Sequence, residues 1–485
     1  MLAAVLARFR GKLKATVDSG RPTLGTIYFP IEVMAREFDA KILLAAGAVA
    51  RGFRVVIGHK FLVEKLARKS PGEGIYFNKA VINPKGDKNF LYFQARGMKL
   101  VAQDEEAGLQ HRTFAEFYEG RRSMRNISQM DKYFCWGETD FRYLRSQIGA
   151  EEAERVLAKT GSARSALWGG LGEIHYRESA NAARRKFGEF ILVATSLPSF
   201  NHILGQRSYL KFFGSGSDIL GSSAEEAHLK RLRLIEIERE KFELFCDSIR
   251  QLILHTPYSV VIRPHPDEAP STWRTAFGGS PRVSVESEGD ISRLLFACSG
   301  FIHSSSTTAL AAYGSVRHLV SIQTGSEAAK LPSLSAFVSD CTSQPDEVAS
   351  LMLRPAFSYL SQEREDALTF RVTGRGSRQN IDSILDELTL LSARGEVWKT
   401  VPFSLAAIAV IRRIVHWGAM LLPTRLLPRQ IVLSSRKRAF KSASQAKEQI
   451  NLSLNLLGTK TAPKIQSIGQ SLFIIEPARP KKKGL

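Results

Sequence analysis

The sequence predicts an α/β protein in which two doubly wound units face one another and a basic helical extension follows them. Short apolar strands alternate with amphipathic helices along most of the chain, which is typical of parallel βαβ units. Two of these strands, at 260–263 and 301–303, break off abruptly into polar residues, as buried parallel strands do at the carboxyl edge of a sheet. The positive charge of the chain is concentrated after residue 401.

The length of 485 residues is enough for roughly two to four domains, each with its own core. We predict a basic amphipathic lead-in at 1–24 and a first α/β unit at 25–172. A second α/β unit is predicted at 187–390, followed by the basic tail at 397–485. Two such units are expected to leave a cleft between them, and ligand sites favour domain interfaces.

The first unit begins with regularly alternating elements. Strands are predicted at 25–30, 53–58, 74–77 and 98–102, with helices at 31–51 and 61–68. Gly52 ends the first helix, as a glycine just beyond a helix C-terminus does. The last of these strands leads directly into Asp104, Glu105 and Glu106.

Three consecutive carboxylates at a strand end are costly to bury, because like charges raise one another's pKa. A general base exploits that situation, and the carboxyl edge of a parallel sheet is where ligands bind. We therefore interpret Asp104–Glu106 as a candidate catalytic turn, with a solvated acidic turn as the alternative. On the first helix, Glu32 and Arg36 are candidates for acceptor binding, or else form a salt-bridged helix face at i,i+4 spacing.

The second unit repeats the pattern. Strands are predicted at 190–195, 260–263, 283–285, 301–303 and 317–322, with helices at 225–254 and 290–297. The strand at 260–263 ends in Arg263, Pro264, His265 and Pro266, and the strand at 301–303 ends in Ser304, Ser305, Ser306 and Thr307. Hydroxyl residues cap helices, and free N–H groups at a helix start bind phosphate. The two loops together predict a cradle for a nucleotide phosphate; alternatively, the prolines only end a strand and the hydroxyls only cap a helix.

The four cysteines are widely scattered, with no Cys-x-x-Cys pair and no histidine at ligand spacing. They indicate ordinary core residues in a reducing compartment, and neither a zinc site nor a disulfide framework. No Asp-x-Asp-like pair lies near the phosphate loops, so metal assistance is not expected.

Several stretches carry a family resemblance that covers about residues 25–390. They are Phe29–Gly58, QDEEAG at Gln103–Gly108, Asp131–Gly137, TGSARSALW at Thr160–Trp168, VIRPHPDE at Val261–Glu268 and FIHSSSTTALAAYG at Phe301–Gly314. The pattern resembles the bacterial surface carbohydrate biosynthesis proteins, GT-B-type glycosyltransferases related to capsule and polysialic-acid transferases. The resemblance implies two Rossmann-like domains and an inverting, metal-independent transfer from a nucleotide-activated sugar. A CMP-linked nonulosonic acid is one such donor, used as a substrate, and no cofactor is implied.

Carried over to this chain, the resemblance makes Glu105 or Glu106 the base that takes a proton from the acceptor hydroxyl. His265, with Pro266, would contact or protonate the departing phosphate, and Ser304–Ser306 would hydrogen-bond it. The first unit would thus serve the acceptor and the second the nucleotide-sugar. The chain departs from the family pattern at Ala107, where glycine usually follows the acid pair directly, and at Thr160–Trp168, which lacks the usual Asn-Pro.

The tail needs a separate interpretation. From Val401 onward the chain has 15 lysines and arginines against two glutamates. The apolar runs 401–411 and 414–422 are divided by Arg412 and Arg413, and neither reaches the ~20 apolar residues of a spanning helix. We predict a helix lying in the interface of an anionic membrane, which places the protein at the cytoplasmic face of the plasma membrane. The alternative is a soluble helical hairpin that packs back on the predicted catalytic cleft.

The leading hypothesis is a membrane-associated glycosyltransferase that acts on a surface glycan or a lipid-linked acceptor. A glycerophosphate transferase or a sugar epimerase on the same two-domain plan is the alternative within enzymes. A nucleic-acid-binding protein acting through the basic tail is the rival outside them. That rival needs aromatic residues among the basic ones for stacking, and beyond Trp417 the tail has only Phe440 and Phe473, so no nucleic-acid partner is expected.

Overall fold

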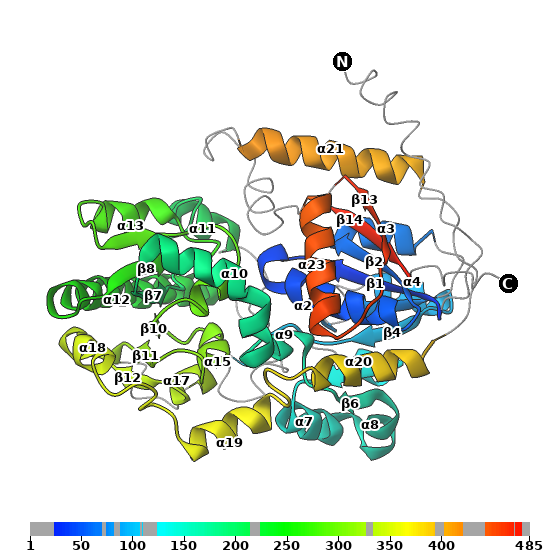
Figure 1. The fold of residues 1–485 in the computed structure, drawn as a ribbon, viewed down its shortest axis with the longest axis horizontal. Helices are drawn as coiled ribbons and strands as arrows, with labels where there is room; N and C mark the ends of the chain where they lie inside the picture. Colours follow the sequence, from blue (N-terminus) through cyan, green and yellow to red (C-terminus); the bar gives the residue numbers. More distant parts are fainter. Residues whose placement is uncertain are drawn as a thin grey trace. The chain divides into compact units, whose positions relative to one another are not determined.

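The structure is a computed structural model of the 485-residue chain. It describes residues 24–69, 74–81, 88–106, 109, 124–213, 224–325, 333–392, 402–420, 442–469 and 471–477. The lead-in predicted at 1–24 therefore lies outside the described residues, except for Leu24. The chain folds into two compact α/β units, which Figure 1 shows as ribbons. Unit 1 comprises Met1–Ala107, Arg121–Leu167 and Val372–Leu485, and unit 2 comprises Gly108–Gly120 and Trp168–Arg371.

Unit 1 is built on an eight-stranded sheet in the order β13-β14-β2-β1-β3-β4-β5-β6. Its parallel strands are Thr26–Ile31 (β1), Arg54–His59 (β2), Ile75–Asn78 (β3), Lys99–Ala102 (β4), Lys132–Cys135 (β5) and Leu157–Lys159 (β6). Its helices are Met34–Ala50 (α2), Lys60–Ala67 (α3), Lys88–Ala95 (α4), Met124–Ser128 (α6), Glu138–Ile148 (α7), Ala150–Val156 (α8), Ala163–Ala166 (α9), Gln379–Leu390 (α20), Phe403–Met420 (α21) and Ala443–Leu456 (α23). Every residue of β1 and β2 is buried, as the apolar, β-branched sequence predicts for central parallel strands.

The strand order of unit 1 reverses beside β1. The next strand in the chain, β2, pairs with one edge of β1, and β3 pairs with the other. Ligands of open parallel sheets bind outside the carboxyl ends of the strands at such a reversal. The residues that follow β1, β3 and β4 therefore lie where a ligand of this sheet would bind.

Unit 2 contains a six-stranded, wholly parallel sheet in the order β12-β11-β10-β7-β8-β9. Its strands are Phe190–Ala194 (β7), Ser259–Arg263 (β8), Val283–Val285 (β9), Gly300–His303 (β10), His318–Ile322 (β11) and Asp340–Thr342 (β12). Its helices are Gly170–Phe187 (α10), Gln206–Phe213 (α11), Ala224–His255 (α12), Pro270–Phe277 (α13), Ser292–Leu295 (α14), Thr308–Ala312 (α15), Leu334–Phe337 (α17), Pro345–Met352 (α18) and Gln362–Arg371 (α19). The strands predicted in both units are confirmed, and most of their predicted ends lie within one or two residues of the observed ends.

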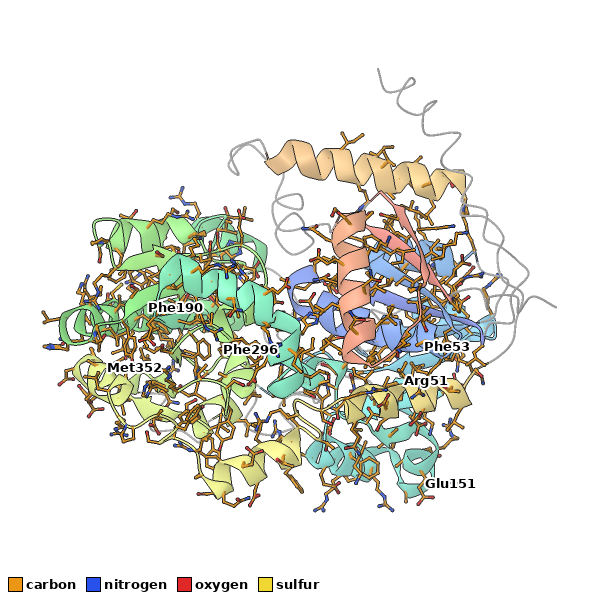
Figure 2. All side chains as sticks on the ribbon, viewed as in Figure 1. Arg51, Phe53, Glu151, Phe190, Phe296 and Met352 are labelled. Atoms are coloured by element: carbon orange, nitrogen blue, oxygen red, sulfur yellow. The ribbon has the colours of Figure 1, made fainter. Side chains whose placement is uncertain are left out.

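In unit 2 the reversal lies between β7 and β10. Strands β8 and β9 add to one edge of β7, and β10–β12 add to the other. Apolar side chains such as Val193, Val260 and Ile302 pack with Trp273 in the core, and Figure 2 shows Phe190 and Met352 inside the same unit. The carboxyl ends of β7, β8 and β10 are thus neighbours by topology. Both units are doubly wound and Rossmann-like, as the sequence predicts; their facing arrangement stays a prediction.

The boundary predicted for the second unit, 187–390, differs from the one observed. The main segment of unit 2 runs from Trp168 to Arg371, and α20 belongs to unit 1. The buried side chain of Asn380 explains the difference, because its Nδ2 donates to Ser162 O, Ser165 Oγ and Thr373 O. This bonding ties the chain back onto α9, a long-range contact that local sequence patterns do not report.

The tail predicted at 397–485 as a separate membrane-associated extension is corrected in its last part. Lys464–Ile468 (β13) and Leu472–Glu476 (β14) form a hairpin, and β14 pairs antiparallel with β2, so the hairpin completes the sheet of unit 1. Helix α23 packs on α2, and Figure 1 shows the two side by side. Gly58 permits the close approach, since a Cβ there would lie 2.2 Å from Ser471 O.

The apolar segment of the tail forms the single helix α21, which passes through Arg412 without a break. Leu405, Ala406 and Ala409 are buried, and the helix contacts α3 and β13. Among the described residues, no helix is both long and apolar enough to cross a membrane. The basic stretches of the tail at 421–441 and 478–485 lie outside the described residues.

Candidate active sites at the two sheet edges

The acid turn of unit 1, Asp104–Glu106, follows β4 and lies beside α2. Lys41 Nζ lies 3.2 Å from the Glu105 carboxylate and 3.6 Å from that of Glu37, and it donates to Pro30 O at 3.0 Å. Lys41 and Glu37 are 2% and 0% exposed. A buried cation is tolerated only with such partners. Lys41 therefore holds Glu105 in one place by an ion pair shielded from solvent.

Arg36 makes the next link in the same network. Its guanidinium lies 3.6 Å from Glu106 and 3.6 Å from Glu37. Burial lowers the pKa of Arg36, but the charges of Glu37, Glu105 and Glu106 outweigh it and leave the pKa raised. The Glu106 side chain is 28% exposed, whereas that of Glu105 is 12% exposed. The structure brings the predicted residues Arg36, Glu105 and Glu106 together, and Glu106 is the more accessible acid.

A second ion pair bridges the reversal in strand order. Lys79 Nζ, just after β3, lies 2.5 Å from the carboxylate of Glu32, just after β1. The expected i,i+4 pair between Glu32 and Arg36 is wrong, because α2 begins only at Met34 and Glu32 lies outside it. Burial would raise the pKa of Glu37, but Lys41, Lys79, the Glu32 backbone N–H and Arg36 together hold that pKa below its ordinary value.

Asp104 was predicted on the acceptor side, but it is only 2% exposed and supports the turn itself. Its Oδ1 accepts from Glu106 N at 2.9 Å, and its carbonyl accepts from Trp136 Nε1 at 2.7 Å. The segment 160–168 adds support, since Arg164 donates to Glu105 O. Asp104 therefore shapes the acid turn, and its predicted contact with an acceptor stays a prediction.

The His265 loop of unit 2, Pro264–Ala269, follows β8. The His265 side chain is 40% exposed, and its Nδ1 accepts from Asp267 N at 3.2 Å. In the neutral ring, an Nδ1 that accepts from Asp267 N leaves the proton on Nε2, and the Asp267 carboxylate lies 3.9 Å from the same Nδ1. Pro266 lies in the turn between the two residues. The imidazole thus has an N–H donor held at the carboxyl edge of the sheet.

Arg263, predicted to contact the phosphate, is committed elsewhere. Its guanidinium is buried and donates to the carbonyl oxygens of Glu286, Glu288 and Gly289, at 3.2, 2.7 and 2.5 Å. Burial also lowers its pKa. Arg263 fastens the loop after β9, and its predicted phosphate contact stays a prediction.

The hydroxyl loop, Ser304–Thr307, follows β10 next to the reversal. Ser305 has φ +54, a left-handed conformation that is uncommon for a residue other than glycine and is found at functional sites. Ser304 is 6% exposed, and its Oγ has no hydrogen-bond partner among the described residues. An unsatisfied buried hydroxyl costs free energy unless a ligand or water completes it.

The expected helix cap in this loop is only partly right. Helix α15 spans just Thr308–Ala312, and Thr307 at its N-cap makes no side-chain bond to the helix backbone. Ser306 supplies the cap instead, because its Oγ accepts from Thr308 N at 3.3 Å. The hydroxyl loop therefore orients its N–H and O–H groups through its own turn.

His303 was missed in the sequence, although it directly precedes the hydroxyl loop. It is 0% exposed, and burial lowers its pKa to about 3, so the ring is neutral. Ser339 Oγ donates to Ser335 O, so His303 Nε2–H donates to Ser339 Oγ and Nδ1 accepts from Ser306 N. A histidine at the end of a buried strand was the sequence signal that could have identified it.

In unit 1 the residue that the sequence analysis missed is Lys41. Its signal in the sequence was a single lysine inside the apolar stretch 40–50.

Within the ranges that the structure describes, no three His, Cys, Asp or Glu side chains cluster in a way that could hold a metal ion. The four cysteines are free thiols. Metal-independent chemistry at these edges remains a prediction.

No protein-family model matches the chain, and no curated protein matches its sequence significantly. Several solved structures are similar to the chain at low sequence identity. The wall teichoic acid polymerase TagF is 10% identical over 76% of this chain and 89% of its own, with a TM-score of 0.43. UDP-GlcNAc 2-epimerase from Methanocaldococcus jannaschii is 11% identical over 76% of this chain and 100% of its own, with a TM-score of 0.47. UDP-N-acetylglucosamine 2-epimerase from Rickettsia bellii is 12% identical over 76% of this chain and 95% of its own, with a TM-score of 0.42. Likenesses this distant leave the reaction to be inferred from the residues of this chain.

Proposed function

We propose that this protein is an inverting, metal-independent glycosyltransferase that moves a sugar from a nucleotide-activated donor to a hydroxyl acceptor. The observation that carries the proposal is the charge network at the carboxyl edge of unit 1. Four carboxylates and three cations meet there within 2.5–3.6 Å, beside the reversal in strand order. Glycosyl transfer needs a base on the acceptor side and charge stabilisation at the departing phosphate.

Glu106 is the proposed base. An acid that takes a proton must reach the acceptor hydroxyl, and Glu106 is more exposed than Glu105. The Glu105 carboxylate is already paired with buried Lys41 at 3.2 Å, so it is the less available of the two acids. Glu105 then orients the acceptor, while Arg36 holds Glu106 in position. Glu32 and Lys79 line the same edge for the acceptor.

Unit 2 is proposed to hold the donor. The Nε2–H of His265 would donate to a phosphate oxygen and stabilise the negative charge that develops on the leaving nucleotide. Ser304 Oγ, without a partner among the described residues, would complete its hydrogen bonding on the same phosphate. The Ser306 N–H is already engaged by His303, which limits the hydroxyl loop to its side-chain donors and its remaining N–H groups.

Thermal unfolding with CMP, CDP, UDP and GDP tests this proposal. We expect at least one nucleotide to raise the unfolding temperature, because a ligand at about 100 times its Kd stabilises the native state by ~2.7 kcal/mol. The preferred nucleotide names the donor class, and the product released from the matching sugar nucleotide separates glycosyl transfer from epimerisation. An unfolding temperature that none of the four nucleotides raises above that of the ligand-free protein would count against a donor site in unit 2.

The proposal extends to the membrane surface through α21. Its buried face packs on unit 1, while Ile411, Ile414 and Val415 are 45–47% exposed at i, i+3 and i+4. Arg412 lies over the Phe61 ring at 5.2 Å, which places a cation beside this apolar stripe. A helix with an outward apolar face and a cation beside it suits an anionic bilayer surface. The acceptor would then be a lipid-linked or nascent surface glycan at the inner face of the plasma membrane.

Vesicle co-sedimentation tests the membrane contact. The variant Ile414→Ser/Val415→Ser is expected to lose about tenfold in binding to vesicles that contain phosphatidylglycerol, because burial of two large apolar side chains is lost. Leu390→Ser is the matched control, since Leu390 is 80% exposed on α20 and lies outside the stripe. Equal binding by all three proteins would remove α21 from the proposal.

A further inference from the structure

Glu268 belongs to the His265 loop and lies four residues after Pro264. At least four groups donate hydrogen bonds to its carboxylate. It is 0% exposed. Its oxygens accept from Leu197 N at 2.9 Å, His265 N at 3.0 Å and Trp273 Nε1 at 3.1 Å. They also accept from Thr195 Oγ at 3.0 Å. These partners are all donors, so the geometry suits the ionised carboxylate.

Glu268 joins two loops at the carboxyl edge of unit 2. Leu197 belongs to the β7 loop, Thr195–Ile203, which lies beside the reversal in strand order. The backbone continues the same connection, because Ile203 N donates to Asp267 O and Ala269 N donates to Asn201 O, both at 2.9 Å. The carboxylate is therefore the centre of a junction that sets the His265 loop against the β7 loop.

Glu238 on α12 provides a matched comparison within the same unit. It is 6% exposed and accepts from Ser199 N at 2.6 Å and Phe200 N at 2.8 Å. It thus holds the β7 loop from the other side and makes no bond to His265 among those described. Burial raises the pKa of both carboxyl groups, and that of Glu238 reaches about 7. The two acids share one loop but differ in whether they touch the His265 backbone.

We propose that Glu268 is a positioning residue that fixes the His265 backbone and imidazole for phosphate binding. The step is non-covalent: Glu268 remains an acceptor and never touches the substrate. The idea deepens the proposed function, on which its nucleotide readout rests. Replacing Glu268 by glutamine leaves an NH₂ group facing N–H donors, and at least one of them must move. The single amide oxygen can serve either the Leu197 and His265 N–H groups or Trp273 Nε1, so one side of the junction that holds the His265 loop loses its acceptor.

The first test is a double-mutant cycle on the full chain, with the nucleotide among CMP, CDP, UDP and GDP that best stabilises the wild type. Glu268→Gln and His265→Ala are each expected to weaken nucleotide binding by about tenfold. The double variant should weaken it hardly further, because residues that act through one another are not additive. Glu238→Gln is expected to lower the unfolding temperature and keep the nucleotide Kd within about threefold. Fully additive losses, or an unchanged Kd in Glu268→Gln, would overturn the proposal.

The second test needs no nucleotide. Long-range ¹⁵N–¹H spectra of the imidazoles should show His265 as the Nε2–H tautomer in the wild type and in Glu238→Gln, but a tautomer mixture in Glu268→Gln. Unchanged His265 signals in Glu268→Gln would refute the positioning role even if no nucleotide binds and the proposed function fails. Should Glu268→Gln not fold, Glu268→Asp keeps the charge one methylene short of its donors, and the same two outcomes apply to it.

Discussion

Replacing His265 by alanine is expected to reduce nucleotide release from the sugar nucleotide by about 10²–10⁴-fold, the usual contribution of a positioned proton donor. The imidazole is 40% exposed, and its Nδ1 already accepts a hydrogen bond from Asp267 N, so Nε2 is the nitrogen that would reach the phosphate. Alanine removes the Nε2–H donor and buries no new group, so the fold should persist. Steady-state release of the nucleotide, with circular dichroism as the check on folding, measures the effect.

Glu106→Gln separates the two halves of this chemistry. It removes the proposed base but leaves unit 2 intact, so transfer should fall while nucleotide binding stays as in the wild type. His265→Ala should lower both. Wild-type turnover in His265→Ala would exclude the imidazole from the reaction, and wild-type transfer in Glu106→Gln would return the role of base to Glu105.

Replacing Glu476 by alanine is expected to destabilise unit 1 by about 3–5 kcal/mol, since it removes the carboxylate from a buried ion pair. Arg54 Nε and Nη2 both donate to Glu476 Oε1, at 3.1 and 2.8 Å, and the two side chains are 3% and 4% exposed. The pair joins β2 to the last strand of the chain. Urea unfolding followed by tryptophan fluorescence should show the transition of unit 1 at lower denaturant, with that of unit 2 unchanged.

The double variant Arg54→Met/Glu476→Leu is the control for this prediction. Apolar replacement of a whole buried ion pair is often neutral, so most of the lost stability should return. Removal of residues 464–485 should be at least as harmful as Glu476→Ala, because it exposes the apolar edge of β2. If removal leaves unit 1 as stable as the full chain, the hairpin is an appendage and its place in the sheet is incidental.

Much of the fold was predictable because its signals are local. β-branched runs mark the central strands of both sheets, and the polar residues that follow β4, β8 and β10 mark their carboxyl ends. The acid turn, His265 and the hydroxyl loop were found for that reason. Lys41 and His303 were not, because a buried charge or imidazole is recognised by its partners, and those partners lie elsewhere in the chain.

The division of the tail shows the same limit. Lysine and arginine between 401 and 485 suggested a solvated, membrane-seeking segment, yet the apolar strand at Leu472–Glu476 was hidden among them. Its antiparallel pairing with β2 joins residues more than 400 positions apart, and periodicity within a short window carries no information on such pairing.

The α/β class, the alternation of strands and helices, and the loops that carry polar chemistry follow from residues that are neighbours along the chain, so the sequence predicts them. The support that Arg263 and Asp104 give to loops, the greater exposure of Glu106 and the junction at Glu268 are visible only in the folded chain. Those roles depend on which groups meet after folding, because burial and hydrogen-bond partners set the chemistry of an ionisable side chain.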